Sequence, residues 1–332
     1  MIDHFKKLAL DELCRSIARN KKTLILYHVR PDADAVGSAF ALRELLRIMN
    51  IPAYCACSDE IPERLLFLAD GVQGSVLLDD GLKIDYERII SVDSASPSQL
   101  GPLYERLHRD VDIMIDHHAK GTVYADNYID PEAAATGEII YRISQRMVEL
   151  GYINKIPERT LNCIYAAISS DTGCFKFSNT TPRTMRIAAE LMEGGVDFSH
   201  INTLLYDSKS LVQLKVEGEA IYRIKTYMDG RISSVVFPYS LSASLAASPE
   251  HLETLIDVAR SVSGVEVAFV VKQNTSENLF NVSMRSVGDV DVSEICACFG
   301  GGGHKRAAGC RIAAESAESA EEKVLEAIFK KF

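Results

Sequence analysis

Three short apolar segments constrain the fold of this chain more than any other feature. Residues 23–27, 88–92 and 111–115 are each rich in Ile, Leu and Val. Segments of this length and composition are typical of buried strands in a parallel sheet. After the first segment, apolar residues recur at helical spacing from Val36 to Met49. The sequence therefore predicts an α/β fold, with a doubly wound and mainly parallel sheet in its N-terminal part.

Acidic and imidazole side chains follow each of these segments, and one more aspartate follows an apolar helical stretch. In chain order they are His28, Asp32 and Asp34, then Asp93, then Asp116, His117 and His118, and finally Asp171. The carboxyl ends of parallel strands share one edge of a sheet, which is where open α/β sheets bind ligands. We therefore expect these side chains to meet at that edge.

The composition of this set indicates a metal site. Carboxylate and imidazole ligands suit Mn²⁺ better than an ion that prefers thiolates. Two ions about 3.5–4 Å apart can share a carboxylate and act on both the attacking and the leaving oxygen of a phosphoester. A single aspartate at a strand end is more often a turn or capping residue. The whole set in this order favours a dinuclear site for phosphoester hydrolysis instead.

Composition limits the other possibilities. The net charge of −10 argues against a long nucleic-acid footprint, so no long duplex is expected as a partner. No apolar run reaches the length of a membrane span, and the N-terminus lacks the apolar core of a signal peptide. Eight cysteines without a Cys-x-x-Cys pair are expected to be small buried hydrophobes in a reducing compartment. We expect a cytoplasmic protein.

The pattern of predicted elements divides the chain into parts. We expect a metal-binding catalytic domain over residues 1–195, a helical linker over 196–220, and a smaller α/β domain over 221–332. In the first domain, helices are predicted at 2–20, 136–150, 157–170 and 181–192, and another at 198–219 connects the domains. In the second, Met-Asp-Gly at 228–230 predicts a hairpin between strands 221–227 and 231–237. A helix at 251–262, strands at 265–271 and 279–284 and a closing helix at 317–329 complete it.

A run of four glycines is the sharpest feature of the second domain. Residues 300–303 are all glycine, and His304, Lys305 and Arg306 follow. Four glycines disfavour any regular element, so an irregular loop is predicted, with the amides of Gly301, Gly302 and Gly303 free to approach an anion. Arg285 and Ser286, at the end of a predicted strand, are candidates for the same anion. A plain flexible loop is the alternative.

At these residues the chain resembles the DHH phosphoesterase superfamily with a C-terminal DHHA1 domain. In size it is most similar to the NrnA-type oligoribonuclease and pAp phosphatase branch, which includes cyclic di-AMP and pApA phosphodiesterases. The motifs that carry the resemblance are His28-x-x-x-Asp32-x-Asp34, Asp93, Asp116-His117-His118, Asp171-Thr-Gly-x-Phe175 and the glycine run with His304.

The resemblance implies two Mn²⁺ ions per subunit, with Asp93 shared between them. His28 and Asp32 would complete the first ion's ligands, and Asp34, His117 and Asp171 would complete those of the second. It also implies that His118 lies beside the scissile phosphate, and Asp116 is predicted as catalytic with it. Arg285 and His304 would hold a terminal phosphate or nucleotide across an active-site cleft between the domains. A homodimer is expected from the family alone.

The sequence leaves the substrate open. Short oligoribonucleotides of two to about five nucleotides, pAp, and cyclic or linear dinucleotides all suit a local pocket better than a long groove. A family II inorganic pyrophosphatase shares the metal set, but the glycine run with His304 is foreign to it. A RecJ-type processive exonuclease is disfavoured by the length of the chain. A nucleotide-sensing module without chemistry is the alternative outside enzymes, and the intact ligand set argues against it.

Overall fold

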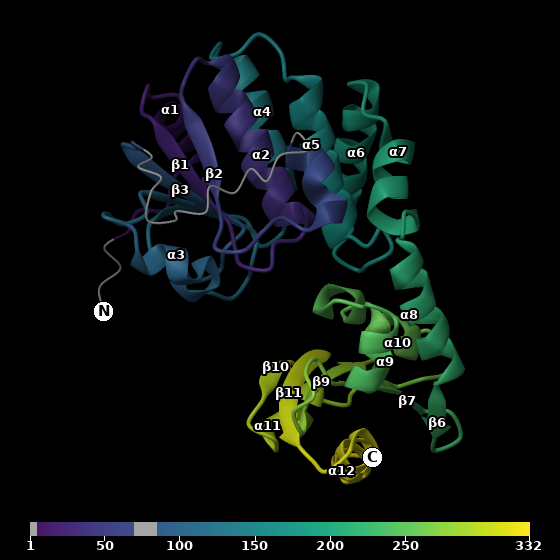
Figure 1. Ribbon diagram of the computed structural model, residues 1–332. Coiled ribbons are helices and arrows are strands. Elements are labelled where there is room, and N and C mark those ends of the chain that lie inside the picture. Colours follow the sequence, from purple (N-terminus) through teal and green to yellow (C-terminus); the bar gives the residue numbers. More distant parts are fainter. Residues whose placement is uncertain (1–4, 70–84) are drawn as a thin grey trace. The chain divides into compact units, whose positions relative to one another are not determined.

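The computed structural model describes residues 5–69 and 85–332, which form two compact units. The first comprises Met1–Ser208 and the second Lys209–Phe332. Each unit has its own sheet (Figure 1). Each also has its own hydrophobic core. Among the described residues, no helix is long and apolar enough to cross a membrane.

The first unit is built on a five-stranded parallel sheet with the strand order β2-β1-β3-β4-β5. The strands are β1 (Thr23–Leu26), β2 (Ala53–Ala56), β3 (Arg88–Val92), β4 (Ile113–Asp116) and β5 (Asp126–Ile129). All residues of β1, β3 and β4 are buried, as expected for a sheet covered on both faces. The predicted parallel α/β sheet is therefore confirmed.

Helices lie on both faces of this sheet. The helices of the first unit are α1 (Leu10–Ile17), α2 (Ala33–Ile48), α3 (Pro102–Glu105), α4 (Thr136–Glu149), α5 (Glu158–Asp171), α6 (Pro182–Glu193) and α7 (Phe198–Asn202). Ile25 of β1 packs with α2, α4 and α5 in the larger core, while its neighbour Leu24 packs with Leu103 of α3 on the other face. The approach of α2 to α5 requires glycine, because a Cβ on Gly37 would lie 2.5 Å from the carbonyl oxygen of Cys163.

The second unit has a mixed six-stranded sheet in the order β10-β11-β9-β8-β7-β6. Its strands are β6 (Lys225–Tyr227), β7 (Ile232–Phe237), β8 (Val267–Lys272), β9 (Leu279–Ser286), β10 (Gly302–His304) and β11 (Ala307–Ala313). Its helices are α8 (Leu211–Tyr222), α9 (Tyr239–Ser244), α10 (Leu255–Arg260), α11 (Val292–Ala297) and α12 (Ala317–Phe329). Met228 and Asp229 adopt left-handed conformations between β6 and β7, which is the geometry of the predicted hairpin turn.

The structure corrects the prediction that the glycine run is irregular. Gly302–His304 forms β10, which pairs antiparallel with β11. The run packs against that strand so closely that a Cβ on Gly301 would lie 2.3 Å from the carbonyl oxygen of Gly309. A Cβ on Gly303 would lie 2.5 Å from that of Ala307. Ladder hydrogen bonds and close backbone packing therefore outweigh the conformational entropy of glycine at these positions.

Several predicted boundaries are also wrong. Residues 2–4 of the predicted N-terminal helix lie outside the described residues. In the described part the helix begins at Leu10, because the backbone around Lys7 pairs with Asn127 of β5 instead. The helix predicted at 198–219 is interrupted, since α7 passes into a single π-helical turn and α8 begins only at Leu211, capped by Ser210. Residue 221 belongs to α8 rather than to a strand, and the helix predicted at 251–262 is reduced to a 3₁₀ turn and α10.

Candidate metal centre

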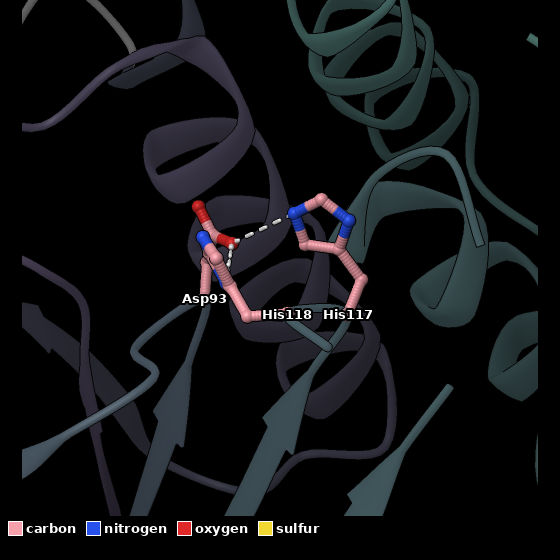
Figure 2. A group of neighbouring side chains, drawn as sticks. All are labelled: Asp93, His117 and His118. Atoms are coloured by element: carbon pink, nitrogen blue, oxygen red, sulfur yellow. Dashed lines mark ion pairs between the residues drawn. The ribbon is translucent and has the colours of Figure 1, made fainter. Parts of the chain in front are cut away.

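The predicted ligands converge at the carboxyl edge of the parallel sheet. His28 follows β1, Asp93 follows β3, His117 follows β4, and Asp171 is the last residue of α5. Figure 2 shows Asp93 beside His117 and His118, with both imidazoles directed at its carboxylate. The donor atoms lie within 4.8 Å of one another in each of three groups: His28, Asp32 and Asp93; Asp34, His117 and Asp171; and Asp93, His117 and His118. The first two groups contain all six predicted ligands.

Asp93 faces both groups. Its Oδ2 lies 3.5 Å from His28 Nε2, and its Oδ1 lies 3.7 Å from His117 Nε2. In the second group, His117 Nε2 lies 3.3 Å from an oxygen of Asp171. A carboxylate with one oxygen toward each imidazole is the arrangement of a shared ligand between two ions.

These distances test whether metal ions fit the residues present. The separations of 3.3–3.8 Å between imidazole and carboxylate atoms are longer than hydrogen bonds. Ligands bound at about 2.0–2.2 Å to one ion stand about 3–3.5 Å from each other, so the observed spacing is close to that of a coordination shell. The donor set of carboxylates and imidazoles is also one that divalent ions such as Mn²⁺ accept. The site therefore fits metal ions.

Backbone carbonyls orient the imidazoles. Nδ1 of His28 lies 2.9 Å from the carbonyl oxygen of Val29, and Nδ1 of His117 lies 3.3 Å from that of Ala133. A carbonyl oxygen only accepts hydrogen bonds, so each Nδ1 carries a proton, and Nε2 is the ring nitrogen that faces the carboxylates and could bind an ion. This is the usual way in which a protein fixes the tautomer of a metal-binding histidine.

The aspartates are held by helix N-termini. Asp34 is fully buried and accepts hydrogen bonds from the amides of Thr136 and Gly137, at 2.7 and 2.9 Å, in the first turn of α4. Thr136 also donates its hydroxyl proton to Asp93 at 3.0 Å. Asp32 is the N-cap of α2, and the predicted strand-to-helix loop ends there, with Asp34 already inside the helix. Thr136 and Gly137 were predicted only as a helix start, yet the amides of a helix N-terminus are well suited to bind a carboxylate.

The carboxylates of the site are buried and close together, so positive charge among them would be stabilising. Burial and the neighbouring Asp34 raise the pKa of Asp171 to about 10. Burial and the neighbouring Asp93 raise the pKa of Asp34 well above its usual value. Burial lowers the pKa of His28, but the carboxylates of Asp32 and Asp93 outweigh that effect and raise it to about 11. Cations bound among these groups would relieve the repulsion that these shifts reflect.

Asp116 and His118 form a separate pair beside the ligands. Asp116 is 1% exposed, and its Oδ1 accepts hydrogen bonds from His118 Nδ1 at 2.7 Å and from the amide of His117 at 2.9 Å. The hydrogen bond with Asp116 raises the pKa of His118 to about 9, although burial opposes it. Since its Nδ1 is engaged, His118 presents Nε2 outward. Because Asp116 is buried and hydrogen-bonded to this imidazole, it can position His118.

Asn179 is a further residue whose role could not be predicted from the sequence. Its amide Nδ2 donates to the carbonyl oxygens of Ala134 and Asp171, both at 3.0 Å. It therefore joins the segment before α4 to the end of α5, where a ligand lies. Asparagine is common in loops, so nothing in the sequence around Asn179 pointed to this role.

In the second unit, the register of three strands places the predicted substrate residues. Ala307 of β11 pairs with His304 of β10 on one side and with Arg285 of β9 on the other. Residues paired in this way share a face, so His304 and Arg285 flank Ala307 about 10 Å apart, twice the spacing of neighbouring strands. A Cβ added to Gly302 would meet nothing within 4 Å, so the space beside the sheet is open at this position.

Ser286 differs from Arg285 and His304 because it is buried. Only 8% of the residue is exposed, and its hydroxyl donates to the carbonyl oxygen of Val290 at 2.8 Å. Its contacts favour a structural role in the turn after β9. Lys305 and Arg306, between β10 and β11, have exposed side chains.

Comparison with known proteins identifies the family. Residues 22–168 match the DHH family, N-terminal domain, and residues 235–331 match the DHHA1 domain. The chain belongs to the DHH family and carries a DHHA1 domain. With relatives that are phosphoester hydrolases and a set of carboxylates and imidazoles that could hold metal ions, this chain is a phosphoester hydrolase of that family.

Individual relatives agree with this assignment. The chain is 29% identical to the bifunctional oligoribonuclease and PAP phosphatase NrnA of Thermus thermophilus, over 92% of this chain and 88% of the relative. It is 26% identical to the cyclic-di-AMP phosphodiesterase GdpP of Geobacillus thermodenitrificans, over 98% of this chain but 49% of that longer protein. Among solved structures, an exopolyphosphatase-related protein from Bacteroides fragilis has the same fold, with a TM-score of 0.87, 23% identity and coverage of 97% and 95% of the two chains.

Proposed function

We propose that this enzyme hydrolyses short oligoribonucleotides of two to about five nucleotides to mononucleotides, and pAp to AMP, with two Mn²⁺ ions. The observation that carries the proposal is Asp93, whose two oxygens face His28 and His117 separately. This arrangement suits a pair of ions rather than one. The similarity to an oligoribonuclease and PAP phosphatase over 92% of the chain supports the choice of substrate.

The residues of the site would have separate roles. His28, Asp32 and Asp93 would hold one ion, and Asp34, Asp93, His117 and Asp171 would hold the other. A pair of divalent ions bound by these residues would lower the pKa of water and stabilise charge on the phosphoryl group. His118, positioned by Asp116, would hold a proton at Nε2 beside the leaving oxygen. The amides of Thr136 and Gly137 would keep Asp34 in place throughout.

Substrate selection requires a second anion site, because metal ions alone bind any phosphoester. We infer that Arg285 and His304, with the backbone of Gly301, Gly302 and Gly303, supply it. Arg285 and His304 share one face of the sheet at its open end, where small residues leave room for a phosphate or a base. The net charge of −10 gives a long polyanion little to bind elsewhere, so short substrates are favoured.

A cyclic di-AMP or pApA phosphodiesterase is the second candidate. The similarity to GdpP over 98% of this chain favours it, and the same metal residues would serve. A panel assay with Mn²⁺ distinguishes the candidates by rates on a diribonucleotide, a five-nucleotide RNA, pAp, cyclic di-AMP and pyrophosphate. We expect the diribonucleotide and pAp to be hydrolysed fastest. Preference for cyclic di-AMP would select the second candidate, and hydrolysis of pyrophosphate alone would refute both.

A further inference from the structure

One exposed aromatic side chain lies on the turn that follows the metal ligand Asp171 and has no part in the proposed chemistry. Phe177 is 46% exposed and follows Asp171, the ligand at the end of α5, by six positions. The chain turns back between them, so that the tip of the Phe177 ring rests on Gly173. A Cβ on Gly173 would lie 2.4 Å from Cζ of this ring. The ring therefore lies over a residue only two positions from a metal ligand.

The turn that places this ring is strained. Gly173, Cys174 and Phe175 have φ values of 55°, 58° and 62°, so three consecutive residues adopt the left-handed conformation. Only glycine adopts it without cost, and runs of it are rare. Strained backbone of this kind persists where the surrounding structure enforces it, which is commonly at functional sites.

Hydrogen bonds to Thr172 enforce the turn. The carbonyl oxygen of Thr172 accepts the amides of Lys176 and Phe177, both at 2.9 Å. Its hydroxyl oxygen accepts the amide of Phe175 at 3.0 Å. Thr172 directly follows Asp171, so the position of the Phe177 backbone is tied to that of the ligand. The backbone that carries the exposed ring is consequently held in place relative to Asp171.

We propose that Phe177 stacks against the nucleobase of the nucleotide whose phosphate is bound at the metal centre. This inference rests on the proposed function. Two residues span at most about 7 Å, so Gly173 and the ring on it are within the reach of a single nucleotide from Asp171. Every nucleobase offers a flat face to an aromatic ring, and stacking of this kind tolerates any sequence. The exposed ammonium of Lys176 lies on the same turn.

The absence of tryptophan from the chain allows a direct test. Phe177→Trp places a single fluorescent indole at the proposed stacking position. With Mn²⁺ present, we expect AMP to quench its fluorescence and ribose 5-phosphate, which lacks a base, to leave it unchanged. The matched control is Tyr152→Trp, because Tyr152 is 38% exposed and lies beyond the C-terminal end of α4, whose N-terminus holds Asp34. This control should respond to neither compound.

Kinetics supply the second measurement. Phe177→Ala should raise KM for a diadenylate about 10- to 100-fold more than KM for the corresponding abasic diribose phosphate, given the usual strength of base stacking. Phe177→Tyr should restore the difference between the two substrates. Because Phe177 is half-exposed, neither substitution is expected to disturb folding, which circular dichroism would verify.

The outcomes separate this inference from the proposed function. Equal quenching of the Phe177→Trp variant by AMP and ribose 5-phosphate, or no quenching by either, would refute stacking. Equal losses of Phe177→Ala on the diadenylate and its abasic analogue would refute it as well. If the wild-type enzyme cleaved no nucleotide while AMP still quenched the tryptophan, the proposed function would fail and the stacking site would stand.

Discussion

Asp93 is the residue on which a dinuclear site depends, because its two oxygens face imidazoles of different groups. We expect Asp93→Ala to remove both bound metal ions and to abolish phosphoester hydrolysis. Metal analysis by mass spectrometry after gel filtration measures the first effect, and circular dichroism verifies the fold. A folded Asp93→Ala protein that retained two ions would show that this carboxylate is not shared.

The two adjacent histidines should behave differently when replaced. His117→Ala should lose metal, since its Nε2 faces Asp34, Asp93 and Asp171. His118→Ala should keep the metal and lose turnover by about 10²- to 10⁴-fold, the usual contribution of a positioned proton donor. Metal content and kcat measured on both variants check this. Metal loss in His118→Ala instead would mean that the two roles are exchanged.

At the scale of elements, β10 shows that glycines of one run differ in their importance. A Cβ on Gly303 would lie 2.5 Å from the carbonyl oxygen of Ala307, whereas a Cβ on Gly302 would meet nothing within 4 Å. Gly303 also has a φ of 145°, which other residues rarely adopt. Gly303→Ala should therefore lower the free energy of unfolding by about 1–3 kcal/mol, while Gly302→Ala leaves it nearly unchanged. Urea unfolding of the two variants compares them, and equal stability would contradict the packing argument.

The elements that could be predicted are those whose pattern is local. β3 and α12 begin and end at the predicted residues, because apolar composition and helical periodicity specify them. β10 could not be predicted, since a glycine run carries no pattern and its strand exists only through pairing with β11. The same holds in the site. Strand ends indicated the ligands, but the amides that hold Asp34 come from residues more than 100 positions later, which only the folded chain brings near.

The whole molecule consists of two units with separate cores, and only the first contains the metal residues. A ligand stabilises what it binds, so Mn²⁺ should raise the melting temperature of the first unit and EDTA should lower it. Scanning calorimetry should show a transition that shifts with Mn²⁺ and another that does not. An Asp93→Ala protein should show no shift. Equal shifts of both transitions would contradict the assignment of the metal site to the first unit.

The charge of the whole molecule predicts a dependence on substrate length. With a net charge of −10, the enzyme should degrade a 20-nucleotide RNA much more slowly than a dinucleotide at physiological salt. Arg285→Ala and His304→Ala should raise KM for the dinucleotide and leave metal content normal. Steady-state kinetics on both lengths test this. Efficient degradation of the 20-mer would show that a longer binding surface exists.

The way in which Asp34 is held has a consequence for the order of assembly. Its carboxylate is fully buried and takes its hydrogen bonds from α4, so it is presented to an ion only after α2 and α4 have docked. An unfolded chain offers no such arrangement, so we expect an ion to bind this carboxylate only after the two helices have docked. The identity of the bound metal would then depend on the ions present once the fold is complete.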